Sequence, residues 1–487
     1  RGWLLREGEE RVVSTLAAVL VVGCVMQSVV GWLQYTGLAK HFTGYLMYRT
    51  GIVEGQLAQR NHFGHYLMWG LLSAAWLWSQ RRLHALLGAA AVLFLSGTMG
   101  LVNSRTILLY VAAVGLLALF WRWRQGRGGN RLLLITLFAL GMVVAVQFSL
   151  NAVLGWLGIS QVETALQRME GSSFAMSARD LEWRNAWRVF RDAPLWGHGW
   201  DSYPLQGFLA GSFPNGFSPN GISVLFTHSH NIVLQLLAEM GLVGTLLVFG
   251  GALWVIWPYF RRPASAESML PLALMTVSLC HSMLEYPLWY IYFLTAFAVM
   301  MSITPSETRI RTGYGIKAML PAASAFLIIC GIVKLGFVYN DLVKFDRHVK
   351  TDTAEEVVRK VSGLERIART EPLLAYYADL SLTRRGTPFD PEIRPWAAEA
   401  SKRALRHRPY ATAYQYALYE YREGNTEKAA EWLEKLYHYY PSSLNYYAKQ
   451  IHASPYFKNL YPDLYRACEA YQKLKPRTES CPRPEAQ

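Results

Sequence analysis

Two histidines, His228 and His230, stand with Asn231 at the point where a long polar loop meets an apolar run. The run continues to Trp257 and is long enough to cross a bilayer. Ionisable groups at the end of a membrane helix are costly, so they usually face a cavity and carry function. Because imidazole is the side chain best suited to move protons near neutral pH, this cluster predicts acid–base chemistry by one of the two histidines.

A second kind of chemistry is indicated by an arginine that needs an anionic partner. Arg105 follows Asn103 and Ser104 in a tight turn between two apolar runs, and no acidic residue stands near it in the sequence. A phosphate would supply the anion, because the guanidinium fork matches phosphate oxygens and the neighbouring side chains add donors. Snorkelling of Arg105 to the membrane interface is the alternative, and we favour the phosphate.

The long loop 151–230 is predicted to hold an amphipathic helix from Ser177 to Val189, which Ser177 can cap. Its positive charge comes from arginines that include Arg179 and Arg184. Two interpretations stay open: the helix lies on the outer membrane surface, or it caps a lipid-phosphate site.

Further polar residues stand beside or within apolar runs. Arg60 and Asn61 immediately precede one run, as an interfacial anchor or as part of a site. Glu239 lies about two helical turns beyond Asn231, where an internal hydrogen bond is the alternative to substrate contact. Such residues within spans are functional candidates by default.

A polar break interrupts the apolar pattern at residues 281–287 and includes Tyr286. Pro287 ends the helical pattern there. His281 and Glu285 are one helical turn apart and could pair. No spacing of cysteine, histidine or carboxylate residues suggests a metal site, and we expect no cofactor.

The composition indicates an all-α polytopic membrane protein. The chain is 52% hydrophobic and 17% charged, whereas soluble proteins are about 25% charged. Nine spans are predicted, at about 12–36, 63–79, 84–102, 104–121, 132–150, 231–257, 267–283, 288–303 and 318–338. Since the sequence begins at Arg1, we expect a fragment from which N-terminal spans are missing.

Basic residues fall in alternate loops and predict the orientation in the membrane. Arg81 and Arg82 follow the second span, and Arg261 and Arg262 follow the sixth. The rule places residues 37–62, 151–230, 281–287 and everything after 338 outside the cytoplasm. The net charge of +14 is scattered over short loops, which favours membrane lipids over nucleic acid as the partner.

Four segments result: membrane helices in 1–150, an outer loop with an amphipathic helix in 151–230, membrane helices in 231–338, and a helical outer tail in 339–487. From Tyr410 to Pro441 the tail resembles one tetratricopeptide (TPR) repeat, although Glu420 stands where the repeat has a tyrosine. A generic antiparallel helical domain is the alternative. Either form suits contact with a partner.

The cysteines divide by location. Cys24, Cys280 and Cys330 fall in apolar segments, where we expect buried small hydrophobes. Cys468 and Cys481 lie in the polar tail and could form a disulfide if the tail is outside the cytoplasm.

The order of these motifs resembles that of the O-antigen ligase/polymerase superfamily of bacterial envelopes. The matching elements are Asn61 to Phe63, Ser104-Arg105, Arg179 to Trp183, Pro194 to Gly199, and His230-Asn231 followed by Glu239, Gly241 and Gly244. Within the superfamily, the break at 281–290 and the repeat-like tail look like the PglL-type protein O-oligosaccharyltransferases, which glycosylate pilin. Ligases that join O-antigen to lipid A core usually lack such a tail.

The resemblance implies a donor glycan on undecaprenyl pyrophosphate and an acceptor serine or threonine of a periplasmic protein such as pilin. It also carries over Arg105, Arg179 and His230 as functional positions. We expect the arginines to bind the pyrophosphate without a metal, and His230, or else His228, to take the hydroxyl proton in an inverting displacement. Further substrate contacts are expected at Arg60, Asn61, Ser104, Arg184, Asn231, Glu239, His281, Glu285 and Tyr286. The protein would lie in the bacterial inner membrane with its site and tail in the periplasm.

Other functions remain open. The same chemistry could serve an O-antigen ligase to lipid A core or an O-antigen polymerase. A lipid-linked glycan transporter would better suit inverted repeats and polar groups spread through the bilayer midplane, and the sequence shows neither. A structural assembly protein would leave the arginines and histidines of the outer face unexplained.

Overall fold

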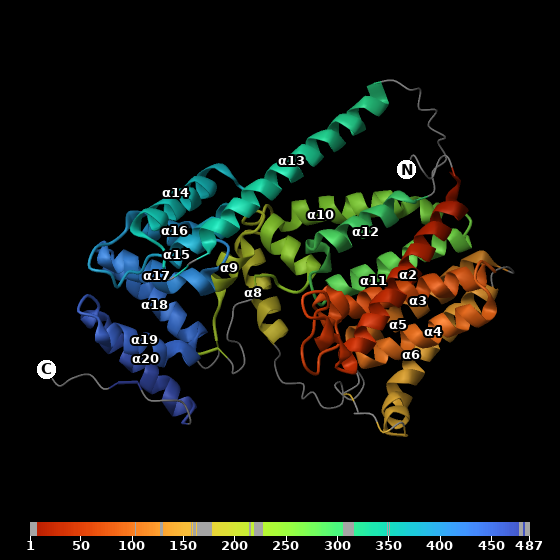
Figure 1. Ribbon diagram of the computed structural model, residues 1–487, viewed down its shortest axis with the longest axis horizontal. Helices are drawn as coiled ribbons and strands as arrows, with labels where there is room; N and C mark the ends of the chain where they lie inside the picture. The colour runs from red at the N-terminus through yellow and green to blue at the C-terminus, as the bar shows by residue number, and fades with distance from the viewer. Residues whose placement is uncertain are drawn as a thin grey trace. The chain divides into compact units, whose positions relative to one another are not determined.

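The computed structural model describes residues 7–102, 104–126, 130–156, 158, 162, 178–213, 216–218, 227–304, 316–347, 349, 351–476 and 481–482. Within these ranges every regular element is a helix, and the single isolated bridge joins Arg49 to Ile52 (Figure 1). The expected all-α class is confirmed. Asn103 and Ser177, which the sequence assigned to a donor turn and a helix cap, lie outside the described residues.

The chain divides into two compact units. The first comprises Arg1–Ser177, His230–Val233 and Thr245–Ile310, and the second comprises Ala178–Ser229, Leu234–Gly244 and Arg311–Gln487. Helix α10 (Ile232–Arg261) therefore contributes residues to both units. The residues that the sequence predicts to take part in chemistry are distributed over both compact units.

The first unit is a bundle around one central helix. Its helices are α2 (Glu9–Tyr35), α3 (Arg60–Ser79), α4 (Ala85–Leu101), α5 (Thr106–Gln125), α6 (Asn130–Trp156), α11 (Ala266–Ser282) and α12 (Ile291–Ser302), with 3-10 turns η1 (Leu38–Phe42), η2 (Gly55–Leu57) and η3 (Pro287–Trp289). Helix α3 contacts α2, α4, α5, α6 and α11, and almost all of its side chains are buried. Polar side chains at its start are thus fixed by the helices around it.

Five of the described helices are long and apolar enough to cross a membrane: Glu9–Tyr35, Thr106–Gln125, Asn130–Trp156, Ile232–Arg261 and Ala322–Asp346. Ala85–Leu101 and Ile291–Ser302 are shorter apolar helices. Large hydrophobic side chains such as Val19, Val22 and Met26 are exposed on α2, as lipid contact requires. These features indicate a multi-pass membrane protein, and the count of nine spans stays a prediction.

The second unit is built from successive helical pairs. Its helices are α8 (Ala178–Asp192), α9 (Tyr203–Ala210), α13 (Ile316–Asp346), α14 (Ala354–Thr370), α15 (Ala375–Thr383), α16 (Pro395–Ala404), α17 (Pro409–Arg422), α18 (Thr426–Tyr439), α19 (Leu444–Ala453) and α20 (Tyr461–Leu474), with η4 (Pro441–Ser443) and η5 (Lys458–Leu460). Contacts join α14 to α15, α15 to α16, α16 to α17, α17 to α18 and α19 to α20.

Helices α17 and α18 form the hairpin that the sequence compared with a tetratricopeptide repeat. The small and apolar residues of that pattern are all buried: Ala413, Ala417, Ala429, Leu433 and Leu436. Gly424 has a φ of 92° and makes the turn between the helices. The repeat assignment itself stays a prediction.

The helices of the loop 151–230 pack with the tail in the second unit. Phe208 on α9 stacks on Tyr439 of α18, with ring centroids 4.7 Å apart. The Tyr439 hydroxyl donates to the Gly207 carbonyl at 2.9 Å, and the backbone N–H of Ser218 donates to the His438 carbonyl at 2.8 Å. Two segments that the sequence treated separately thus share one hydrophobic core.

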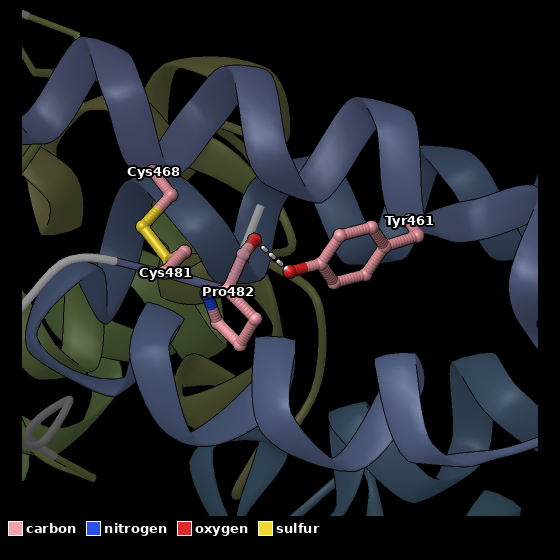
Figure 2. Close-up of a disulfide and its surroundings, with 4 residues drawn as sticks. All are labelled: Tyr461, Cys468, Cys481 and Pro482. Atoms are coloured by element: carbon pink, nitrogen blue, oxygen red, sulfur yellow. Dashed lines mark hydrogen bonds between the residues drawn. A yellow bond between two sulfur atoms is a disulfide. The ribbon is translucent and has the colours of Figure 1, made fainter. Parts of the chain in front are cut away.

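The cysteines of the tail are joined in a disulfide, Cys468–Cys481 (Figure 2). Tyr461, on the same helix as Cys468, donates its hydroxyl proton to the carbonyl of Pro482, the residue next to Cys481. Of the free cysteines, Cys24 is buried as expected and Cys280 is half-buried. Cys330 is exposed, contrary to the expectation, because the apolar stretch of α13 has no buried residues.

Candidate functional site

The opening residues of α10 are held in a defined, uncommon geometry. His230 has a φ of 57°, a left-handed conformation that few non-glycine residues adopt. The Asn231 side chain accepts a hydrogen bond from the N–H of Val233 at 3.0 Å and donates to the Met283 carbonyl at 3.3 Å. Helix start and polar break are therefore tied together. Strain of this kind clusters at functional sites.

Glu285, in the break after α11, is the partner of His230. The His230 Nε2 atom lies 3.6 Å from Glu285 Oε2, and both side chains are about nine-tenths buried. The second oxygen, Oε1, accepts a hydrogen bond from the Asn61 amide at 2.9 Å. A buried carboxylate beside an imidazole can orient the ring and stabilise the imidazolium that forms when it takes a proton.

Asn61 extends the contact to the turn before α5. The Ser104 hydroxyl donates to Asn61 Oδ1 at 2.7 Å and lies 2.7 Å from the Thr106 hydroxyl. Ser104 is 1% exposed, whereas Arg105, the next residue, is exposed and caps α5. The N-terminal turns of α3 and α5 are thus side by side in the first unit.

Two arginines stand at these helix starts. Arg60 is the first residue of α3 and is half-buried, and Arg105 is the N-cap of α5. A helix N-terminus presents backbone N–H groups and a positive dipole end, so both positions suit an anion such as a phosphate.

Aromatic rings border the histidine. Tyr286 meets the His230 ring edge-on, with centroids 5.1 Å apart, and stacks on Tyr290 at 5.7 Å. His62 lies 4.6 Å from the Tyr290 ring. These rings restrict the positions that His230 can adopt.

Beneath the break lies a pair of buried imidazoles. His281 Nδ1 is 2.9 Å from His65 Nδ1, and His65 Nε2 is 3.2 Å from the Ser278 hydroxyl. One Nδ1 must carry the proton that the other accepts. The expected pairing of the His281 and Glu285 side chains stays a prediction. The Glu285 N–H donates to the His281 carbonyl at 2.9 Å, and the described side-chain contacts are those of His281 with His65 and of Glu285 with Asn61 and His230. His65 was missed, although a histidine one turn after His62 on a membrane helix was the signal.

In the second unit Glu239 serves as an internal hydrogen-bond acceptor. Its Oε1 accepts from the Tyr203 N–H at 3.2 Å and from the Gln235 amide at 3.0 Å. Gln235 in turn accepts from the N–H of Ser229 at 2.8 Å, next to the buried His228. These contacts fit the structural alternative for Glu239.

Helix α8 carries Arg179, half-buried, and Arg184, exposed. Its buried residues include Leu181, Ala186 and Val189 together with Glu182, whose Oε2 accepts a hydrogen bond from the Tyr203 hydroxyl at 2.5 Å. Burial raises the pKa of Tyr203 well above its ordinary value, so this hydroxyl stays protonated and donates. The expected amphipathic helix is thus present as α8, with its start and end near the predicted bounds.

The expected site residues fall into two groups. In the first unit are Arg60, Asn61, Ser104, Arg105, His230, Asn231, His281, Glu285 and Tyr286, and in the second are Arg179, Arg184, His228 and Glu239. Contacts bring together Asn61, Ser104, His230, Asn231, Glu285 and Tyr286. Among the described residues, no three or more His, Cys, Asp or Glu side chains are grouped to hold a metal ion.

Comparison with known families places these residues in matched segments. Residues 90–249 match the family described as O-antigen ligase, residues 269–452 the C-terminal part of a membrane-bound virulence-factor polymerase, and residues 55–78 a protein glycosylation ligase. Asn61, Arg105, His230 and Glu285 all fall within these ranges.

A curated relative is the general O-oligosaccharyltransferase of Acinetobacter baylyi, 23% identical over 343 residues. The match covers 68% of this chain and 57% of the relative, so the chain spans little more than half of that protein's length. No solved structure matches significantly.

Apolar helices and matched segments together define a multi-pass membrane protein of the glycan ligase and polymerase class. The chain is similar to the O-antigen ligase superfamily and, within it, to the protein glycosylation ligases.

Proposed function

We propose that this chain transfers a glycan from undecaprenyl pyrophosphate to serine or threonine hydroxyls of periplasmic proteins such as pilin. The observation that carries the proposal is a chain of hydrogen bonds and contacts in the first unit that joins the Arg105 turn to His230. A turn bearing Arg105 is hydrogen-bonded through Ser104 and Asn61 to Glu285, which faces His230. One end suits a phosphate and the other suits a proton acceptor.

On the donor side, Arg105 and Arg60 bind the pyrophosphate at the N-termini of α5 and α3. Charge grows on the pyrophosphate as the glycosidic bond breaks, and fixed guanidinium groups stabilise that charge without reorganising. Arg179 of α8 is a further proposed ligand of the pyrophosphate by its likeness to the family's motif, and Arg184 is a further proposed substrate contact. No metal is required, because the arginines take the place of a divalent cation.

On the acceptor side, His230 removes the proton of the attacking hydroxyl, and His228 is the second candidate. The new bond joins the hydroxyl oxygen to the anomeric carbon, while the bond from that carbon to the phosphate oxygen breaks. The proton goes to imidazole, and undecaprenyl pyrophosphate leaves. A single displacement from the opposite face inverts the anomeric configuration. Asn231, His281 and Tyr286 shape the substrate site around this reaction, while Glu239 keeps the internal hydrogen bonds described above.

The compartment is proposed on independent grounds. The disulfide Cys468–Cys481 fits an oxidising environment, and alternate basic loops orient the membrane helices. We therefore place the site and the tail in the periplasm of a bacterium, with the spans in its inner membrane. The tail, with its TPR-like hairpin, presents the acceptor protein.

A related acceptor is the second candidate. The match of residues 90–249 to O-antigen ligase favours lipid A core, and the match of 269–452 to a polymerase favours a growing glycan. The glycosylation-ligase match at 55–78 and the oligosaccharyltransferase relative favour protein.

A competition among acceptors tests the proposal. The purified chain in lipid nanodiscs receives undecaprenyl-pyrophosphate glycan with a pilin-like protein, lipid A core or further repeat units. We expect sugar on the protein, and no sugar when the donor is replaced by undecaprenyl pyrophosphate that carries no glycan. Sugar on lipid A core or on repeat units alone would assign one of the alternatives. In sealed proteoliposomes, movement of the donor across the bilayer without transfer would indicate a transporter.

A further inference from the structure

Thr106, Ser104, Asn61 and Glu285 form a chain of hydrogen bonds in the first unit. The donor and acceptor of each bond can be assigned by counting the available protons. Ser104 has one hydroxyl proton, which it donates to Asn61 Oδ1. The Thr106 hydroxyl at 2.7 Å must then be the donor to Ser104. The hydroxyl protons of Thr106 and Ser104 and one amide proton of Asn61 are therefore donated in the direction of Glu285.

Glu285 fixes the other end of this chain. Its Oε1 accepts from the Asn61 amide, so reversing that amide would set an oxygen against a carboxylate oxygen. Its Oε2 faces His230 Nε2, so the favoured tautomer carries the proton on Nε2. The lone pair that can accept a substrate proton is then on Nδ1.

The last link is longer than the others. At 3.6 Å the Glu285–His230 contact exceeds hydrogen-bond length, whereas the links from Asn61 and Ser104 are 2.9 Å and 2.7 Å. Catalytic hydrogen bonds are often long before substrate binds and tighten in the complex. A small movement of Asn61 would close this gap.

We propose that Ser104, Asn61 and Glu285 form a positioning relay, which couples anion binding at the Arg105 turn to the orientation of His230. The inference rests on the proposed function and assigns a task to a carboxylate that was expected to contact substrate or to pair with His281. Donor bound at the start of α5 fixes Thr106 and Ser104, and the relay then holds Glu285 in place opposite His230. The general base is thereby aligned only when the donor is present.

The members of the relay are expected to act together on the position of His230. Buried polar chains are costly unless every member is satisfied, so their members act as a unit. The titratable groups described against His230 are Glu285 and Tyr286, and His281 lies one turn before Glu285 on α11. Of these, only Glu285 is a carboxyl group that is also connected to the Arg105 turn.

A double-mutant cycle tests the coupling in the full chain in nanodiscs. The variants are Glu285→Gln, Ser104→Ala and their combination. For Glu285→Gln we expect kcat to fall about 100-fold with the donor KM changed less than about threefold, the pattern of a lost general-base alignment. For Ser104→Ala we expect a fall of about tenfold, with a raised donor KM. The double variant should be no slower than Glu285→Gln alone, because the loss of Glu285 already removes the effect of Ser104 on His230.

A second readout does not depend on transfer. Diethyl pyrocarbonate modifies neutral imidazole, so the rate of His230 carbethoxylation against pH, followed by mass spectrometry, reports its protonation. We expect the midpoint to lie about one pH unit lower in Glu285→Gln than in the wild type, because the carboxylate favours the charged ring. In the wild type, addition of undecaprenyl pyrophosphate should move the midpoint upward, and in Ser104→Ala it should not.

The outcomes separate the relay from the function. Ser282→Ala is the control, because this buried hydroxyl bonds to the Ser278 carbonyl of its own helix, outside the relay. Additive losses in the cycle, or midpoints that ignore both Glu285 and the donor lipid, overturn the relay even if the wild type glycosylates protein. A wild type that transfers no glycan overturns the proposed function, while the carbethoxylation midpoints still decide the relay.

Discussion

Asn61 donates a hydrogen bond to Glu285 at 2.9 Å, although 224 residues separate them in the chain. The bond joins the start of α3 to the break after α11, and thus connects the segment matched to protein glycosylation ligases with the segment matched to the polymerase. Because Asn61 also accepts from Ser104, it connects the α5 turn to Glu285, which faces His230 before the start of α10. Four tests address the site and the fold that holds it.

The first test removes the imidazole without disturbing the backbone. His230 has a φ of 57°, which glycine adopts without the strain that alanine would suffer, so His230→Gly is the cleaner variant. We expect the transfer rate to fall about 10²–10⁴-fold with an unchanged melting temperature, and external imidazole to restore part of it. His228→Ala should lose about tenfold or less. If His228→Ala lost more than His230→Gly, the two roles would have to be exchanged.

The second test concerns the guanidinium of Arg105. Arg105→Ala should lower kcat about 10²–10³-fold, since a donor to developing charge is removed. Arg105→Lys keeps the charge but loses the fork, so its rate should stay well below that of the wild type. Arg122 stands near the other end of the same helix and bonds to Asn130, so Arg122→Ala is the matched control. Near-normal transfer by Arg105→Lys would argue against two-point phosphate binding.

The sequence predicted the chemistry of single positions better than the contacts between them. The helix start at His230-Asn231, the amphipathic α8 and the buried positions of α17–α18 follow from local pattern, and the structure has all three. The pairing of Glu285 could not follow from local pattern. Helical spacing indicated His281 as its partner, and the long-range packing of α3 against α11 adds Asn61. Glu239 likewise depended on Tyr203, from a segment far away in the sequence.

Another feature that periodicity hides is the interruption of α10. Gly241 has a φ of 63° and a ψ of −170°, and breaks an apolar run that reads as one continuous helix. The residues around it bond to residues 194–199 instead: Leu242 N–H donates to the Pro194 carbonyl, and Gly199 N–H donates to that of Glu239, both at 2.8 Å. Backbone groups freed by the break are thus satisfied by a neighbouring loop.

The third test uses this break. A Cβ on Gly241 would lie 2.4 Å from the carbonyl of Leu195, and its φ is unfavourable for any other residue. We expect Gly241→Ala to destabilise the protein by about 1–3 kcal/mol, measured as a lowered melting temperature in detergent. Gly250 lies in the same helix with open space around its Cα, so Gly250→Ala should be neutral or slightly stabilising. Equal melting temperatures for the two variants would contradict the described break.

The last test is the pH dependence of the α17–α18 hairpin, which depends on the residue that departs from the repeat pattern. Glu420 is 5% exposed and accepts from Lys428 at 2.8 Å and from Asn425 at 2.7 Å. Burial alone would raise the pKa of Glu420, but hydrogen bonds from Lys428, Tyr416 and Asn425 outweigh it, and the pKa is lowered. The hydrogen bond to Glu420 is also the main cause that raises the pKa of Lys428.

The sign of the effect follows from these directions. A carboxyl whose pKa is lowered by folding stabilises the hairpin above its unfolded value of about 4.3 and loses that contribution as pH falls through the lower, folded value. The raised pKa of Lys428 gives a contribution that is present below about pH 10.4 and is lost as pH rises through the folded value. The pair thus stabilises α17–α18 over the whole neutral range.

Glu420→Gln should lower amide protection of these helices at pH 7, with a smaller difference from the wild type at the acid end. Hydrogen exchange, corrected for intrinsic rates, measures this, and Glu431→Gln, exposed on α18, is the control. An equal difference at pH 7 and at the acid end would show that Glu420 acts through its shape and not through its charge.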